Sequence, residues 1–182
     1  AANNVGVGYY ALAANTTGAQ NTAEGSLALQ ANTTGGNNTS VGYAAMYTNT
    51  TGAANTSVGH GSLESNTTAS NNVAVGFDAL TANTTGTENT AVGMSSAAAN
   101  TTGNYNTALG KGTLQTNTTG TNNTAVGTNS LQNATTASNN VAVGDSALIT
   151  NTTGASNTAV GKFALRYNTT AANNTAMGQD AL

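Results

Sequence analysis

The 182 residues of this chain contain no cysteine, proline or tryptophan. Without cysteine, a disulfide scaffold is impossible. Charged residues make up only 5% of the sequence, with three basic against six acidic side chains, and this excludes a basic surface for nucleic acid. No apolar run approaches the length of a membrane span. We therefore expect neither nucleic-acid binding nor a membrane span in this segment.

A repeat of 17 residues fills the sequence. Asparagine recurs in this step, and each unit starts at one of Asn4, Asn21, Asn38, Asn55, Asn72, Asn89, Asn106, Asn123, Asn140, Asn157 and Asn174. Glycine recurs four places later, at Gly8, Gly25, Gly42, Gly59, Gly76, Gly93, Gly110, Gly127, Gly144, Gly161 and Gly178. One register over the whole chain argues against disorder and predicts a single continuous array across residues 1–182, with no separate domain.

The start of each unit has the alternation of a short strand. Counting the recurrent asparagine as position 1, position 2 is Thr or Val, and position 4 is Val, Leu or Met except at Glu24. Because side chains alternate along a strand, positions 2 and 4 share a face, which we expect to be the core. Glu24 on that face would need a partner, water or a proton. The glycine at position 5 predicts a turn with positive φ or close passage to another segment.

The second half of the unit supplies another apolar column and a second corner. Position 9 is Leu in nine units, with Met46 and Ala97 as the departures, and we expect this column in the core. An Asn-Thr-Thr corner follows, with its asparagine at Asn15, Asn32, Asn49, Asn66, Asn83, Asn100, Asn117, Asn151 and Asn168; Ala134 interrupts the series. These triplets are also N-glycosylation sequons. The interpretation we favour is that Asn and Thr bond one coil to the next.

Two short strands and two turns per unit predict an all-β fold, a β-solenoid or parallel β-roll with a 17-residue coil and about eleven coils. Helical repeats are excluded because they need units of about 33 residues or more and better helix formers. Position 3 is Gly, Ala or Ser and position 8 is Ala, Ser or Thr. We expect these small residues to face away from the apolar columns, against a neighbouring chain or the opposite wall of a tight roll.

No catalytic, cofactor-binding or metal-binding residues are predicted. His60 is the only histidine and falls in a variable turn, and the six carboxylates form no column. An enzyme on a β-helix would need clustered carboxylates in a cleft. Tyr9, Tyr10, Tyr43 and Phe77 follow the turn glycines and are either ordinary exposed side chains or an aromatic strip for carbohydrate or another partner.

The motif "NTAVG" followed by "AL" and "NTTG" resembles the tandem head repeats of trimeric autotransporter adhesins, the YadA-like left-handed parallel β-roll. It is similar also to repeats in phage tail fibres and large bacterial surface proteins. Units such as 157–161 and 123–127 carry the match, which extends over the whole chain. The resemblance implies architecture far more than function.

These features predict a non-enzymatic structural repeat segment of an extracellular fibre, adhesin or filament at the cell surface. Its expected partner is the chain itself, as a homo-oligomer or a filament, with a host surface or carbohydrate as a further partner. Because both ends fall inside a repeat, we expect the chain to continue.

Two other functions are open. One is the shaft of a phage tail fibre. The other is an ice-binding solenoid, which needs a Thr-x-Thr array on one bare face, whereas adjacent residues such as Thr16 and Thr17 should point in opposite directions.

Overall fold

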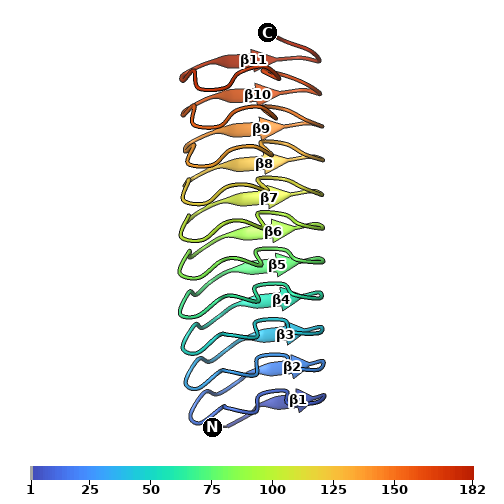
Figure 1. Ribbon diagram of the computed structural model, residues 1–182, viewed down its shortest axis with the longest axis vertical. Coiled ribbons are helices and arrows are strands. Elements are labelled where there is room, and N and C mark those ends of the chain that lie inside the picture. Colours follow the sequence, from blue (N-terminus) through green and yellow to red (C-terminus); the bar gives the residue numbers. More distant parts are fainter. Residues whose placement is uncertain (1) are drawn as a thin grey trace.

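The computed structural model describes residues 2–182 as a β-solenoid of 17-residue coils, and within that range it contains no helix. Figure 1 shows the chain climbing in one direction, with its first and last coils at opposite ends of a rod. Eleven parallel strands form one sheet in sequence order. The predicted fold class is therefore confirmed.

Each coil contributes one strand of three residues. The strands are β1 (Val5–Val7), β2 (Thr22–Glu24), β3 (Thr39–Val41), β4 (Thr56–Val58), β5 (Val73–Val75), β6 (Thr90–Val92), β7 (Thr107–Leu109), β8 (Thr124–Val126), β9 (Val141–Val143), β10 (Thr158–Val160) and β11 (Thr175–Met177). The register is one full repeat at every step, as in Val5 opposite Thr22 and Thr158 opposite Thr175. Equivalent residues of successive units therefore stack in columns. Neighbouring residues of one column lie about 4.8 Å apart.

The central residue of each strand points inward. Ala23 and Ala74 at position 3 have no exposed surface, whereas Val58 at position 4 is 36% exposed and Glu24 is exposed as well. The prediction that positions 2 and 4 face the core was therefore wrong, and so was the expectation that position 3 faces away from the apolar column. Glu24 needs no buried partner because it projects into solvent.

The small residues fit the space left between the two walls of one chain. Position 3 lies against position 8, where the Ser57 hydroxyl donates to the Ser62 carbonyl at 2.8 Å. It also faces position 9, since a Cβ added to Gly6 would lie 3.7 Å from Leu12 Cδ1. Two contacts were expected for the small residues at positions 3 and 8. The structure shows the contact with the opposite wall of a tight roll. A chain–chain contact at positions 3 and 8 is excluded by their burial within the single chain.

The apolar core is the leucine column at position 9, as predicted. Its members are the largest fully buried side chains, including Leu29, Leu63, Leu114 and Leu131. With one large aliphatic side chain per coil, the facing residues must be small for the two walls to meet at interior packing density. The thin core is thus filled by a single chain.

The return segment of each coil, positions 6–12, is a series of turns rather than the second strand that the sequence pattern predicts. Position 9 has positive φ throughout, for example 52° at both Leu29 and Leu131, and position 7 shares this conformation. A regular strand needs negative φ at every residue, so the positive φ at positions 7 and 9 prevents one. The segment still bonds to the next coil, because Leu29 N–H donates to Ala45 at 2.9 Å and Ala31 N–H to Tyr47 at 3.1 Å.

The glycine at position 5 ends each strand for two reasons. At Gly93 φ is 132°, which side-chain-bearing residues rarely adopt, and an added Cβ would lie 2.6 Å from the carbonyl carbon and oxygen of Gly110 in the next coil. Both explanations offered by the sequence therefore hold at this turn.

We predict that Gly93→Ala lowers the free energy of unfolding by about 1–3 kcal/mol, because it adds backbone strain and a clash with the next coil. Thermal unfolding followed by circular dichroism measures the loss. Gly36→Ala is the matched control, since position 16 carries alanine in other units such as Ala19 and Ala53. Equal stability of the two variants would contradict this account of the turn.

Candidate functional site

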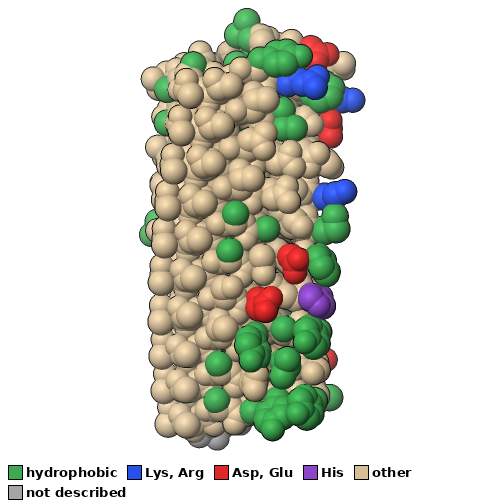
Figure 2. Space-filling model, viewed as in Figure 1, with side chains coloured by type: hydrophobic (Ala, Val, Ile, Leu, Met, Phe, Trp, Pro, Cys, Tyr) green, Lys and Arg blue, Asp and Glu red, His purple; other side chains and the backbone are tan. Residues whose placement is uncertain are grey.

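Most of the charged side chains and His60 lie along one edge of the rod (Figure 2), at positions 6, 7 and 10 of the repeat; Glu24 at position 4 and Glu88 at position 17 are the exceptions. Figure 2 shows the acidic and basic groups, the histidine and the large apolar groups gathered there, while most of the remaining face is uncharged. Within residues 2–182, no three His, Cys, Asp or Glu side chains are grouped to hold a metal ion. His60 lies in an exposed turn, with Nδ1 3.9 Å from Asp78 Oδ1. The candidate functional features are therefore repeating columns and a few local side-chain groups.

The asparagines at position 1 form a ladder inside the rod. Asn21 is fully buried; its side-chain oxygen accepts from the backbone N–H of Asn38 at 3.0 Å, and its amide nitrogen donates to the Gly35 carbonyl at 2.9 Å. Each asparagine thus bonds to the coil that follows and to the corner of its own coil. This recurring amide replaces the water that the buried backbone would otherwise need.

The asparagines at position 12 form a second buried ladder beside the first. Asn32 donates through one amide nitrogen to Asn15 Oδ1 at 2.8 Å and to the Gly35 carbonyl at 3.0 Å. The Gly35 carbonyl therefore accepts from both Asn21 and Asn32. This shared acceptor ties the two ladders together within each coil.

This arrangement is at odds with glycosylation of the Asn-Thr-Thr corners. Seven of the nine predicted acceptor asparagines are buried, and the two at the ends, Asn15 and Asn168, are partly so. In Asn32 both amide hydrogens are committed to bonds within the rod. A glycan on this nitrogen would have to break the ladder, so the folded chain favours the alternative in which Asn and Thr bond coil to coil.

The second ladder is interrupted once. Ala134 occupies position 12 where the other complete units have asparagine. As a consequence Asn117 Oδ1 is buried without a hydrogen-bond partner, and Asn151 donates only to Gly154, at 2.9 Å. An unpaired buried carbonyl loses its hydration without compensation, which costs about 1–3 kcal/mol.

Two adjacent threonine columns differ in their bonding. The hydroxyl of Thr33 at position 13 donates to the Thr50 carbonyl at 3.0 Å, and the same bond recurs along the column. Thr34 at position 14 is exposed, and no hydroxyl in its column has a hydrogen-bond partner within residues 2–182. The expectation that residues such as Thr16 and Thr17 differ in direction agrees with this contrast.

The outer face of the sheet consists of two columns, Thr or Val at position 2 and mainly Val at position 4. Val92 and Leu109, paired at position 4 of β6 and β7, are 38% and 36% exposed, and Thr107 at position 2 of β7 pairs with Thr90. Glu24 is the single charged side chain in these columns. We call positions 2 and 4 of β1–β11 the outer sheet face; sequence reasoning missed it because it assigned the same residues to the core.

The aromatic side chains near the turn glycines form two separate groups. The His60 ring stacks between Tyr43 and Phe77, at 5.1 Å from each. Tyr9 and Tyr10 meet edge to face at 4.4 Å. Ser26 follows the turn glycine in the coil between the two groups, so the four aromatic residues do not form one continuous strip.

A basic and aromatic cluster lies in the tenth coil. Arg166 is 4.5 Å from the centre of the Phe163 ring, and Lys162 lies 4.9 Å from the same ring. Asp145 and Asp180 occupy the turns of the neighbouring coils.

No family model, curated protein or solved structure matches this chain. In residues 2–182 there is also no helical segment with the length and hydropathy that crossing a membrane requires.

We predict that Ala134→Asn stabilises the rod. The new amide can donate to Asn117 Oδ1 and accept from Asn151, which restores the ladder and adds about 1–2 kcal/mol to the free energy of unfolding. Thermal denaturation should show a rise in Tm of a few degrees.

Asn100→Ala is the reciprocal control. It leaves Asn83 Oδ1 without its donor, so it should lower Tm by a similar amount. A fall in Tm for Ala134→Asn would show that the site has no room for the amide, and no change would show that the ladder contributes little.

Proposed function

We propose that this chain is a non-enzymatic structural segment of an extracellular fibre or adhesin. The observation that supports this most is the unbroken sheet β1–β11, in which every coil bonds to the next in one register. Axial ladders suit a mechanical element, because a load along the rod is shared by backbone and asparagine bonds in every coil. The resemblance to adhesin head repeats agrees with such a role.

The repeated, nearly uncharged surface suits contact with many identical or weak partners. Only nine of 182 residues are charged, and the remaining exposed columns present Thr, Val and Asn in one spacing. Weak contacts repeated along a rigid rod give avidity without a strong individual site. An extracellular location and an adhesive role are inferred from this surface.

Self-association would use the outer sheet face. Positions 3 and 8 are buried inside the chain, so they are unable to serve as the contact. The outer sheet face offers exposed valines in a flat array, and contiguous exposed apolar patches commonly mark interfaces. We therefore propose that copies pack side by side through this face.

Replacing Thr107 by Arg should weaken this association at least tenfold, since it places a charge in the centre of an apolar contact. Sedimentation equilibrium of the chain and the variant measures the change. Thr102→Arg, in the exposed position-14 column, should leave association unchanged. A wild-type chain that stays monomeric at high micromolar concentration would contradict self-association.

The fibre itself is tested by locating the native protein. Immunogold electron microscopy with antibodies against this chain should label filaments on the outside of intact source cells. Label confined to released virus particles would favour the phage tail-fibre shaft instead. Label confined to the cell interior would overturn the extracellular proposal.

Ice binding is the second candidate, and the outer sheet face is the observation that favours it. Thr and Val have the same branched shape, and they recur about 6.6 Å apart along each strand and about 4.8 Å apart from one strand to the next. The threonine hydroxyls of this face have no partner within residues 2–182, as a surface that orders water requires. The array is Thr-x-Val rather than the Thr-x-Thr expected for an ice-binding face.

The two functions make opposite demands on the outer sheet face, because ice needs it bare. Nanolitre osmometry of the purified chain should show no thermal hysteresis if the fibre proposal holds. Hysteresis that Thr107→Arg abolishes and Thr102→Arg preserves would replace the fibre by an ice-binding role.

A further inference from the structure

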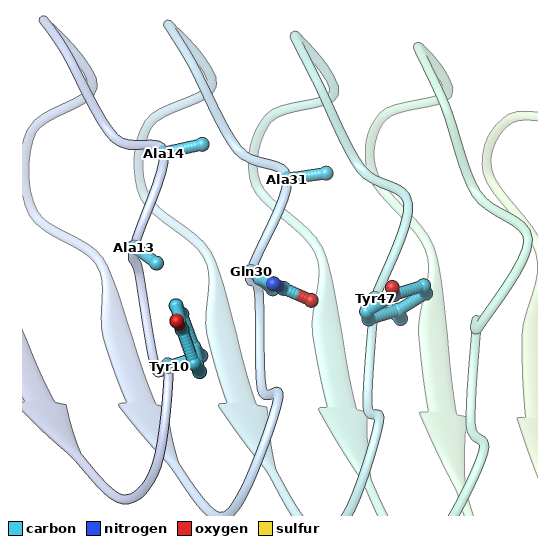
Figure 3. A pocket seen from close by; sticks show the side chains of 6 residues that line it. All are labelled: Tyr10, Ala13, Ala14, Gln30, Ala31 and Tyr47. Carbon is cyan, nitrogen blue, oxygen red and sulfur yellow. The ribbon is translucent and has the colours of Figure 1, made fainter.

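A hollow opens on the side of the first three coils, where the side-chain columns are interrupted. Its volume is about 400 Å³, and it is lined by Tyr10, Ala13, Ala14, Gln30, Ala31 and Tyr47. Figure 3 shows Tyr10, Gln30 and Tyr47 projecting from three successive coils, with the three alanines beside them. The volume lies within the range of about 300–1,000 Å³ that is usual for small-molecule sites.

The hollow lies where positions 10 and 11 of the first coil carry small side chains. Positions 10 and 11 are both alanine in the first coil, at Ala13 and Ala14, whereas the fourth coil has Glu64 and Ser65 there. Tyr10 bounds the gap on one side and Tyr47 on the other, two coils apart along the rod. The sixth coil also has alanine at both positions, at Ala98 and Ala99, so it is the pair of tyrosines beside the alanines that distinguishes this place in the array.

Gln30 carries an amide that is unused in the folded chain. Its Oε1 is buried without a hydrogen-bond partner, and its amide nitrogen makes no bond within residues 2–182. Gln132 has the same position in the eighth coil, where its amide nitrogen donates to Gln115 Oε1 at 2.9 Å. At Gln30 the column neighbours are Ala13 and Tyr47, so this pairing is impossible. The amide can turn toward a ligand without breaking a protein bond.

We propose that this hollow binds a neutral sugar ring. A pyranose has apolar C–H faces that pack on aromatic rings and a rim of hydroxyls that both donate and accept. Tyr10 and Tyr47 supply the rings, and the Gln30 amide supplies an acceptor and two donors for the rim. The phenol hydroxyls of both tyrosines also have no partner within residues 2–182. No charged side chain lines the hollow, which favours an uncharged ligand.

The site deepens the proposed adhesive role and rests on it for its biological meaning, since it names carbohydrate as the surface that the fibre contacts. Its position on the return segment, positions 7–11, keeps it off the outer sheet face. Sugar binding and side-by-side packing of rods can therefore occur together.

Saturation-transfer difference NMR with the purified chain tests the site. The probes are the methyl glycosides of galactose, glucose and mannose and free N-acetylglucosamine, with N-acetylneuraminic acid as the acidic comparison. We expect millimolar binding of at least one neutral probe and none of the acid. Failure of all neutral probes, or binding of the acid alone, overturns the proposal and leaves the immunogold test of the fibre untouched.

Three variants locate the binding. Tyr47→Ala and Gln30→Ala should each weaken it at least tenfold, and Tyr10→Ala should act likewise. Tyr105→Ala removes an exposed tyrosine elsewhere, and Gln115→Ala removes a glutamine of the same column, so both should bind as the parent chain does. Circular dichroism spectra and Tm values matched to the parent establish that a loss is local. Equal loss in the control variants would place the sugar elsewhere and overturn the assignment.

Discussion

The buried carbonyl at the Asn-Thr-Thr-Gly corner is the constraint on which the rest of the rod depends. A chain that turns so tightly encloses backbone groups that water is unable to reach, and each coil brings another. Two asparagine side chains from one coil converge on that carbonyl, at Gly35 for example, and each asparagine also bonds across to a neighbouring coil. The same amides that satisfy the corner thus fix the register of the stack. This explains why asparagine, an unusual interior residue, recurs more regularly than any apolar residue except the turn glycine.

The repeat length, the parallel stacking and the leucine core could all be predicted from the sequence, because each follows from a strict period. Which face of the strand is buried could not. Alternation divides the side chains into two faces but does not say which one is inside. Valine at position 4 has the hydropathy of a core residue, yet the space opposite Leu29 and its equivalents admits only Ala, Ser or Gly. The volume of the side chains therefore determines which face of the strand is buried. The charge of Glu24 was the one sign in the sequence that position 4 is on the exposed face.

The turns on the return side were hidden from sequence reasoning for a different reason. Leucine with positive φ is strained in isolation, so no local propensity predicts it. The structure places it there in nine units, as at Leu29 and Leu63, with Met46 and Ala97 in the same conformation in the other two, because inter-coil bonds and burial outweigh the strain. The local groups were equally hidden. Tyr10, Gln30 and Tyr47 come together only after the 17-residue stacking is known, since they belong to three different units, with Tyr10 at position 7 and the other two at position 10.

The second asparagine ladder has a direction. Asn32 donates to Asn15, Asn49 to Asn32 and Asn66 to Asn49, so the side-chain amides all point the same way along the axis. Their dipoles add instead of cancelling, so the rod has a net dipole along its axis. Its two ends are chemically unlike, one offering amide donors and the other amide acceptors. Two rods lying side by side are therefore distinguishable as parallel or antiparallel, and the antiparallel arrangement is the one in which their axial dipoles attract.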